Sequence, residues 1–397
     1  MPNDLVRRAV GRLRRTLTGG RPAPGPPQPP VVGYVVAGAD GAHPASAHVR
    51  VVRRTEHLAA SGTARVRQVD PAAVVDGSDT TPYRSVLVQR DVLPRALVAP
   101  FAEALRARGT RLVAEVDDDF FTESGRQRLA RAEYDPDRLA SIDALVRTAD
   151  TVVVSTDELD RVVRPLARRT VVVPNALDPT LWTVPDDGAA PSGAAPSGVD
   201  ASGVDASGAD APGVEASGVD AVRPTGEHRV LYMGTLTHGA DLALLRDVFT
   251  DLVAPDGLPV RLEVIGVTED PDDGWYRRIE VPDGHYPAFA RWLVAHRGRW
   301  RAGVAPLEDA VFNRAKSDLK ALEYTALDLP AVVSARPSYR VAGQHGITTV
   351  PDDPGAWRAA VTAAVARGYA DPTAADWVRR ERFIGRDGDT WRDVLLG

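Results

Sequence analysis

The chain has 397 residues, more than a single hydrophobic core ordinarily serves, so two domains are the first expectation. The net charge of -6 argues against a general nucleic-acid binder, whose surface would be basic. There is no cysteine, which excludes disulfides, cysteine zinc sites and thiol nucleophiles.

The first 30 residues differ in composition from the rest. Apolar side chains recur at helical spacing among arginines over 4–17, which predicts a short basic amphipathic helix, and a proline-rich run over 22–30 follows. Such a helix would contact an anionic membrane surface, or it would be a solvated tail. The chain shows no secretory signal and no apolar stretch of the roughly 20 residues that cross a bilayer. We expect a cytoplasmic protein. If the basic helix contacts the membrane, the protein would lie peripherally on its inner face.

Predicted strands and helices alternate over residues 31–187. Valine-rich runs predict strands at 31–36, 85–89, 111–116, 151–155 and 170–174, and helical patterns lie at 95–108 and 138–149. Near-continuous apolar strands between helices are typical of a parallel sheet that is covered on both faces. Residues 31–187 are therefore predicted to form one doubly wound, Rossmann-like α/β domain.

Residues 188–226 interrupt this pattern. They cycle through Ala, Ser, Gly, Val and Asp with almost no large side chain, so we expect a disordered, acidic low-complexity linker. A second α/β domain is predicted over 227–376, with strands at 229–233, 261–265, 302–305 and 331–334 and helices at 241–252, 286–296 and 357–366. Residues 377–397 are expected to form one helix that crosses back between the domains. Two such domains would face each other across a cleft, at the carboxyl ends of their strands.

Three consecutive carboxylates, Asp117, Asp118 and Asp119, follow the predicted strand at 111–116. They contain an Asp-x-Asp pattern, which in another transferase fold holds Mn²⁺ together with a donor diphosphate. In a protein with two α/β domains we prefer an acceptor-side role, in which Asp118 or Asp119 orients a sugar hydroxyl or accepts its proton, with Asp117 beside it. A cluster that caps a helix is the alternative.

The segment 303–324 suggests a nucleotide-sugar site. An apolar run ends in a polar loop, a helix is predicted to open with Asn313 and the cations that follow it, and Glu323 comes two turns later. Cations and open backbone N–H groups at a helix start favour phosphate, and a carboxylate could accept hydrogen bonds from sugar hydroxyls. A solvated charged face and a simple serine cap are the alternatives. The predicted donor-binding residues of this segment are Glu308, Asn313, Arg314, Lys316, Ser317, Lys320 and Glu323.

A second donor-binding loop is predicted after the strand at 229–233. Gly234 lies between this strand and a helix, a position at which the backbone can approach a ligand closely; an ordinary tight turn is the alternative. Thr235 and His238 complete the predicted loop. His238 would donate to a phosphate, or it would be a solvated residue at a helix start.

Three segments resemble the group 1 (family 4) glycosyltransferases, in particular their bacterial branch of surface-polysaccharide and O-antigen-type pathways. The segments are 173–178, which begins VPNA, 232–241, which begins YMGTLTH, and 303–324, which contains GVAPLED and FNRAKSDLKALEY. The resemblance implies a GT-B fold, a retaining mechanism, a nucleotide-diphosphate sugar donor held mainly by the second domain, and no obligatory metal or cofactor. It also implies that the loop with His48 and Arg50 borders the cleft on the acceptor side; a helix start with solvated side chains is the other interpretation.

Two positions depart from the family pattern. Many members carry an arginine and a lysine shortly after the glycine that matches Gly234, where this chain has threonines and a histidine. Many also carry two glutamates separated by seven residues, of which Glu323 matches the second, whereas Ala315 replaces the first. The charge of a donor diphosphate must then be neutralised by other cations. The candidates are Arg314, Lys316 and Lys320.

We therefore predict a glycosyltransferase of the hexosyltransferase class, which moves a sugar from a nucleotide diphosphate to a glycan or lipid-linked acceptor in cell-surface polysaccharide synthesis. Its partners would be the nucleotide sugar, the acceptor and an anionic membrane, and not nucleic acid. One alternative is an epimerase or phosphorylase of the same shape; a phosphorylase would need Lys316 or Lys320 for a pyridoxal Schiff base. The other is a non-catalytic nucleotide-sugar-binding subunit, motivated by the missing first glutamate.

Overall fold

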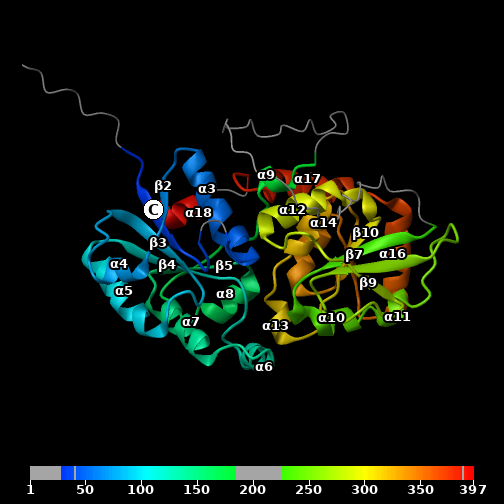
Figure 1. Cartoon of the computed structure of the whole chain (residues 1–397), viewed down its shortest axis with the longest axis horizontal. Helices are drawn as coiled ribbons and strands as arrows, with labels where there is room; N and C mark the ends of the chain where they lie inside the picture. Colours follow the sequence, from blue (N-terminus) through cyan, green and yellow to red (C-terminus); the bar gives the residue numbers. More distant parts are fainter. Residues whose placement is uncertain (1–27, 40–41, 185–225, 387–388) are drawn as a thin grey trace, which may run out of the picture.

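The computed structural model describes residues 28–39, 42–184, 226–386 and 389–397. They form two α/β domains, one coloured blue to teal and the other green to orange in Figure 1. The predicted basic helix over 4–17 lies outside the described residues, and so does the predicted linker over 188–226 except for its last residue.

The first domain is built on a six-stranded sheet in the order β2-β1-β3-β4-β5-β6, in which all neighbouring strands are parallel. Valine-rich strands such as β5 are buried along their whole length, because helices cover both faces of the sheet. The strands are β1 (Val31–Val35), β2 (Arg65–Gln68), β3 (Tyr83–Gln89), β4 (Arg111–Val116), β5 (Thr151–Val154) and β6 (Thr170–Val172). The helices are α2 (Ala45–Ala47), a π-helical turn (His48–Val52), α3 (Arg53–Ala60), α4 (Pro71–Val75), α5 (Arg95–Ala107), α6 (Glu123–Arg131), α7 (Pro136–Thr148), α8 (Asp157–Val163) and α9 (Pro179–Trp182).

The second domain repeats the design with a six-stranded parallel sheet in the order β12-β11-β10-β7-β8-β9. The strands are β7 (His228–Met233), β8 (Val260–Ile265), β9 (Tyr276–Arg278), β10 (Ala302–Ala305), β11 (Ala331–Ser334) and β12 (Thr348–Val350). The α-helices are α10 (Gly239–Ala243), α11 (Arg246–Phe249), α12 (Tyr286–Ala295), α13 (Val311–Arg314), α14 (Leu319–Ala326), α15 (Arg340–Gln344), α16 (Pro354–Arg367), α17 (Pro372–Glu381) and α18 (Thr390–Leu396). Short 3-10 turns cover Leu236–His238, Arg297–Arg299 and Pro337–Tyr339. Two Rossmann-like sheets with crossing C-terminal helices form a GT-B arrangement, which confirms the predicted fold class.

Two predicted helices of the second domain are each divided in two. The helix predicted over 241–252 is α10 and α11. The helix predicted to open at Asn313 is α13 and α14, with residues 315–318 between them. Tertiary contacts explain the second break: the Ala315 carbonyl accepts a hydrogen bond from the Thr156 hydroxyl of the first domain at 2.9 Å, and Asp318 is held by Arg382.

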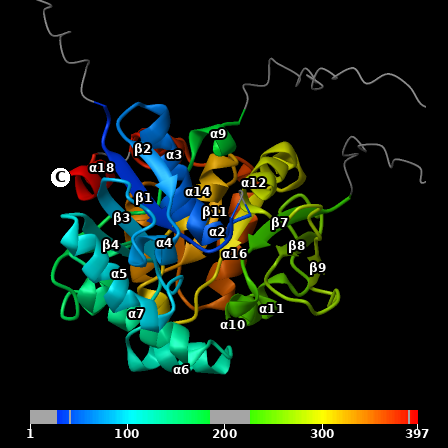
Figure 2. The same ribbon diagram turned by 60° about the vertical axis from the view of Figure 1, so that its left-hand side comes forward.

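The prediction of a single crossover helix over 377–397 is wrong, because this stretch contains the end of one helix and a second, separate helix. α17 begins at Pro372, before the predicted boundary, and packs Trp377 and Val378 into the core of the second domain. α18 packs Trp391 and Leu395 against the first domain, where the Ser85 hydroxyl donates to the Leu395 carbonyl at 2.7 Å. Figures 1 and 2 both show α18, in red, against the first domain. The apolar pattern of this stretch therefore serves two separate cores.

The chain passes between the domains at two places that lie side by side. The N–H of Leu177 donates to the Arg382 carbonyl at 2.8 Å, and the N–H of Ile384 donates to the Leu177 carbonyl at 2.9 Å. Arg382 also donates to both carboxylate oxygens of Asp318, at 2.6 and 2.7 Å, and to the Asn175 carbonyl at 2.9 Å. The buried guanidinium of Arg382 thus ties both passages to the start of α14.

Replacing Arg382 with alanine is expected to lower the free energy of unfolding by about 3 kcal/mol, because the Asp318 carboxylate would stay buried without its partner. Urea-induced unfolding followed by circular dichroism measures the loss. Arg379→Ala is the control, since Arg379 lies in the last turn of α17, just before Arg382, but its side chain is 62% exposed and its ion pair with Asp376 is long, at 4.0 Å. Equal effects of the two substitutions would contradict the bracing role of Arg382.

Candidate functional site

Each sheet has one position at which the strand order reverses, and most of the predicted site residues lie near it. In the second sheet the reversal falls between β7 and β10, so it is bordered by the loops that follow Met233 and Ala305. In the first sheet it falls between β1 and β3, bordered by the loops after Val35 and Gln89. Open α/β sheets bind their ligands at such positions, because the loops diverge there and leave space at the carboxyl ends of the strands.

Gly234 continues the end of β7 into the first of these loops. Its N–H donates to the Ile265 carbonyl at 3.0 Å. A Cβ atom on Gly234 would lie 3.2 Å from the imidazole of His238, so the missing side chain leaves room for that ring. Thr235 follows at an exposed position. The predicted contact of this loop with a donor diphosphate remains a prediction.

Asp241, in the first turn of α10, joins the two loops of the second domain. Its Oδ1 accepts from the backbone N–H of Glu308 at 2.7 Å and from Asn313 Nδ2 at 3.3 Å, and its Oδ2 lies 2.7 Å from His238 Nδ1. Complete burial opposes ionisation of this carboxyl, but the hydrogen bonds hold its pKa below the usual value. Asp241 therefore stays ionised and connects the loop after β7 with the loop after β10.

His238 is buried, and both of its ring nitrogens have neighbours. Nδ1 faces Asp241, and Nε2 lies 3.2 Å from Lys320 Nζ. Burial, together with the nearby Lys320 ammonium, lowers the pKa of His238 to about 4, so the imidazole is neutral at pH 7. A direct bond from His238 to a phosphate would require one of these two neighbours to move.

Lys316 and Lys320 bring two ammonium groups to the boundary between the domains. Lys316 lies between α13 and α14, and Lys320 lies in the first turn of α14. They are the only lysines among the 48 lysines and arginines of the chain. Burial, followed by repulsion from Lys316, lowers the pKa of Lys320 to about 8. Two cations held near each other in a poorly hydrated place favour an anion beside them.

An ion pair with the first domain neutralises Lys316 in this structure. Lys316 Nζ lies 2.9 Å from Asp118 Oδ1 and 4.8 Å from the centre of the Phe312 ring. Burial would raise the pKa of Asp118, but the Lys316 ammonium holds it below the usual value. The structure therefore brings together a residue predicted to bind the donor and a residue predicted to be catalytic.

The neighbouring carboxylates have other surroundings. Asp117 Oδ1 lies 3.3 Å from Arg90 Nη1, and burial raises the pKa of Asp117 to about 6. Asp119 accepts hydrogen bonds from the backbone N–H groups of Phe121 and Thr122, at 3.0 and 2.9 Å, and from the Thr122 hydroxyl. Asp119 thus stabilises its own turn, as in the capping alternative, and its predicted catalytic role is untested.

Glu323 lies in a buried environment of aromatic rings. Burial raises its pKa to about 8, so its carboxyl group is mainly protonated at pH 7. Nearby, the Tyr286 hydroxyl accepts a hydrogen bond from Trp182 Nε1 at 3.1 Å. The Tyr286 ring also stacks on His48 of the first domain, with ring centres 5.8 Å apart. The predicted acceptor-side His48 and the predicted donor-binding Glu323 are therefore both near Tyr286.

A chain of hydrogen bonds connects Arg50 with Ser317. Arg50 is buried and donates through Nε to Glu115 at 2.7 Å and through Nη1 to Asn175 Oδ1 at 2.7 Å. Asn175 Nδ2 in turn donates to the Ser317 hydroxyl at 2.7 Å. Asn175 thus links the predicted acceptor side to the start of α14.

Two residues of the predicted donor site lie at its edge. Arg314 is exposed and pairs with Asp309 at 3.3 Å. Glu308 has an exposed side chain that lies 3.9 Å from Arg128, a residue of α6 in the first domain. The Arg128 guanidinium also lies 5.0 Å from the centre of the Phe312 ring. Nothing in the sequence around Arg128 signals this contact, whereas Asp241 could have been found from its position three residues after His238.

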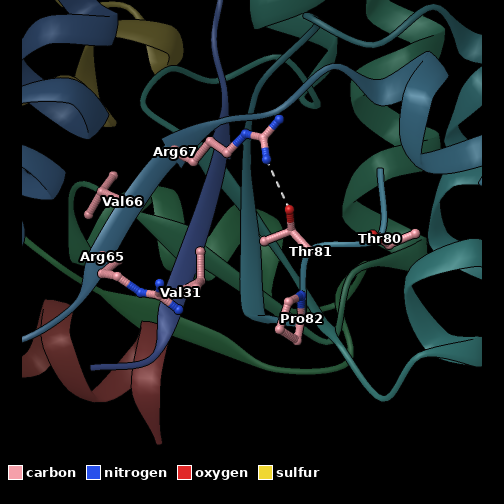
Figure 3. A pocket seen from close by; sticks show the side chains of 7 residues that line it. All are labelled: Val31, Arg65, Val66, Arg67, Thr80, Thr81 and Pro82. Carbon is pink, nitrogen blue, oxygen red and sulfur yellow. Dashed lines mark hydrogen bonds between the residues drawn. The ribbon is translucent and has the colours of Figure 1, made fainter. Parts of the chain in front are cut away.

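Two cavities open on the first domain. One, of about 480 Å³, lies at the amino ends of β1 and β2, on the side of the sheet opposite its carboxyl ends. Figure 3 shows this cavity, with the Arg67 guanidinium donating to the Thr81 hydroxyl at 3.0 Å. The second, of about 720 Å³, lies between the starts of α5 and α7 and is lined in part by Asp91 and Arg138. Neither cavity is lined by a predicted site residue.

Within the described ranges, no group of three or more histidine, aspartate or glutamate side chains is arranged to hold a metal ion. Among the helices that the structure describes, none combines the length and apolar character needed to span a bilayer.

Comparison with protein-family models and with the sequences of curated proteins finds no match. Several solved structures are similar over most of the chain. One is AviGT4, a glycosyltransferase involved in avilamycin A biosynthesis, at 13% identity and a TM-score of 0.47, covering 93% of this chain and 99% of that one. Another is the lipopolysaccharide outer core galactosyltransferase WaaB, at 10% identity and a TM-score of 0.46, covering 92% and 100%. A third is LpCGTa in complex with UDP, at 12% identity and a TM-score of 0.40, covering 92% and 98%.

Proposed function

We propose that the protein is a glycosyltransferase that moves a sugar from a nucleotide diphosphate to a glycan or lipid-linked acceptor. The observation that supports this most directly is the pair Lys316 and Lys320 at the carboxyl ends of the second sheet, opposite Asp118 of the first. Repulsion between the two ammonium groups contributes to the lowered pKa of Lys320, and a bound diphosphate would relieve it.

The chemistry of sugar transfer explains why such cations matter. As the bond between sugar and diphosphate breaks, negative charge builds up on the departing phosphate oxygens. Fixed cations at that place stabilise the transition state more than the ground state, and a poorly hydrated surrounding strengthens their effect. In this proposal Lys316 and Lys320 supply the charge that a divalent cation supplies in other transferases.

Glu323 and Asp118 complete the proposed site. Glu323 would bind the ribose hydroxyls of the donor from the middle of α14, and Asp118 would orient the acceptor hydroxyl or accept its proton. Because Asp118 is bonded to Lys316 here, the donor diphosphate must displace it. The paired passages at Leu177 and Phe383 are the place where the domains would hinge to admit the donor.

The finer parts of this proposal rest on the resemblance of the segments 173–178, 232–241 and 303–324 to family 4 glycosyltransferases. These finer parts are transfer with retention of configuration at the sugar, a hexose or deoxyhexose donor, and a role in cell-surface polysaccharide synthesis. Peripheral contact with an anionic membrane would come from residues 4–17.

A thermal-shift screen against nucleotide sugars tests donor binding. A nucleotide sugar that binds only the folded protein at 100 times its dissociation constant is expected to stabilise it by about 2.7 kcal/mol, which is seen as a higher Tm. The free sugars serve as controls, because they lack the diphosphate that the two lysines would bind. A screen in which no nucleotide sugar raises Tm would refute the proposal.

A non-catalytic nucleotide-sugar-binding subunit is the second candidate. It is motivated by Ala315, which occupies the position of the first family glutamate and uses its carbonyl to contact Thr156 of the first domain. Calorimetry that shows nucleotide-sugar binding, combined with no transfer or hydrolysis of the labelled donor, would favour this candidate.

A further inference from the structure

We propose that Asp241 is a positioning residue which, through His238, holds the Lys320 ammonium in place to receive the donor diphosphate. This inference rests on the proposed function, which it extends by assigning different roles to His238 and Lys320. Lys320 would contact the phosphate, and the imidazole would orient Lys320 instead of binding the phosphate itself.

The hydrogen-bond geometry determines the direction of each bond. An ammonium group can only donate, so at 3.2 Å His238 Nε2 must accept from Lys320 Nζ. The remaining proton of a neutral imidazole is then on Nδ1, which donates to Asp241 Oδ2 at 2.7 Å. The pKa of His238, lowered to about 4, agrees with a neutral ring.

Asp241 is itself held rigidly. Its other oxygen accepts from the backbone N–H of Glu308 at 2.7 Å and from Asn313 at 3.3 Å, and the residue is fully buried. The chain Asp241–His238–Lys320 therefore connects a fixed carboxylate to a side chain that would otherwise rotate about four bonds. Such support from residues behind the binding group is what keeps a charged group in a productive position.

The composition of the chain supports a specific need for an ammonium group here. Arginine serves as the basic residue everywhere except at Lys316 and Lys320. A guanidinium is planar and cannot give up its proton at physiological pH, whereas an ammonium is compact and its pKa responds to its surroundings. The two lysines thus lie where a compact cation with a pKa that responds to its surroundings would suit a phosphate.

Other charged groups also face this chain of hydrogen bonds, and several of them affect the titration of Lys320. Lys316 disfavours its ammonium form, whereas the carboxylates around it favour that form. The groups are Asp118 from the first domain, Lys316 from the connection before α14, Glu323 from α14, Asp241 from α10 and, beside Asp241, Arg128 from α6.

The presence of only two lysines makes a direct experiment possible. Protein labelled with ¹³C at lysine Cε gives two side-chain signals, which Lys316→Arg and Lys320→Arg identify. We expect the wild-type Lys320 signal to titrate near pH 8. In Asp241→Asn the midpoint is expected to fall by at least ~1 pH unit, because the carboxylate that favours the ammonium is gone. Asp256→Asn is the matched control, since Asp256 pairs with His228 at 2.7 Å on the surface, and it should leave Lys320 unchanged.

Histidine ¹⁵N spectra of the wild type test the direction of the bonds even if Asp241→Asn does not fold. A neutral His238 with its proton on Nδ1 is expected. A protonated ring, or a proton on Nε2, would overturn the inference. An unshifted Lys320 midpoint in a folded Asp241→Asn variant would also overturn it.

Pyrophosphate binding, measured by calorimetry, connects this chain to the donor. Affinity should weaken as pH rises through the wild-type Lys320 midpoint, and Asp241→Asn should bind at least ~10-fold more weakly at pH 7.5. In a His238→Gln background the same substitution should have a smaller effect; an undiminished effect would show that Asp241 does not act through His238. If the spectra agree but wild-type protein binds neither pyrophosphate nor UDP, GDP or dTDP, the positioning holds and the proposed function fails.

Discussion

Lys316→Ala is expected to reduce kcat/KM for sugar transfer by about 100-fold, the effect typical of removing one group that stabilises transition-state charge. The substitution removes the ammonium that lies 2.9 Å from Asp118 and 4.8 Å from the Phe312 ring centre. It also leaves Asp118 without its main cationic partner, so affinity for the donor should fall as well. Initial rates with labelled donor, combined with donor titration by calorimetry, measure the two effects separately.

Two further variants sharpen this test. Lys316→Arg keeps the charge but enlarges the group, so only partial activity is expected if the ammonium must fit between Asp118 and Phe312. Arg246→Ala is the control, because Arg246 is exposed and pairs with Asp273 away from the site. Unchanged donor affinity and transfer rate in Lys316→Ala would refute the role assigned to this lysine.

Glu323→Gln is expected to stabilise the free protein and to weaken nucleotide-sugar binding. Burial raises the pKa of Glu323 from 4.5 to about 8, so between these values the folded protein keeps a proton that the unfolded chain has released. Wild-type stability therefore decreases as pH rises from about 4.5 to 8. Glutamine has no such proton to lose, so the variant should gain up to roughly 4 kcal/mol over wild type at pH 8 and little at pH 4.5.

Denaturant unfolding of wild type and Glu323→Gln from pH 4.5 to 8.5 checks the stability part. The functional part requires donor affinity at pH 8.5, where most of Glu323 is ionised; it should fall because an amide has one acceptor oxygen, whereas the carboxylate can accept from two ribose hydroxyls through its two oxygens. Glu381→Gln, at the end of α17 and exposed, is the control. A stability difference that does not depend on pH would contradict burial as the origin of the raised pKa.

The strands and the sheet class could be predicted from the sequence because they depend on local pattern. Thr151–Val154 and Ala331–Ser334 are valine-rich and buried along their whole length, as is typical of strands covered on both faces. Short or polar strands such as Arg65–Gln68 and Tyr276–Arg278 escaped prediction, since an edge strand needs little apolar surface.

Helix continuity could not be predicted, because contacts with distant residues interrupt it. Thr156 accounts for part of the break after Ala315, and Arg382 fixes Asp318 before α14. The prediction for the C-terminal stretch failed for a similar reason. Trp377 packs into the core of one domain, whereas Trp391 packs into the core of the other. Apolar periodicity shows that a residue is buried but not which core receives it.

By itself, the sequence determined the two Rossmann-like domains and the kinds of side chain gathered near Lys316, because periodicity and loop composition are local properties. Only the tertiary structure decided how those side chains are paired. It joined Lys316 to Asp118, engaged both nitrogens of His238 and placed Asp119 in its own turn. Pairings of this kind depend on distances between residues far apart in the chain, and the energies of buried charges depend on those distances.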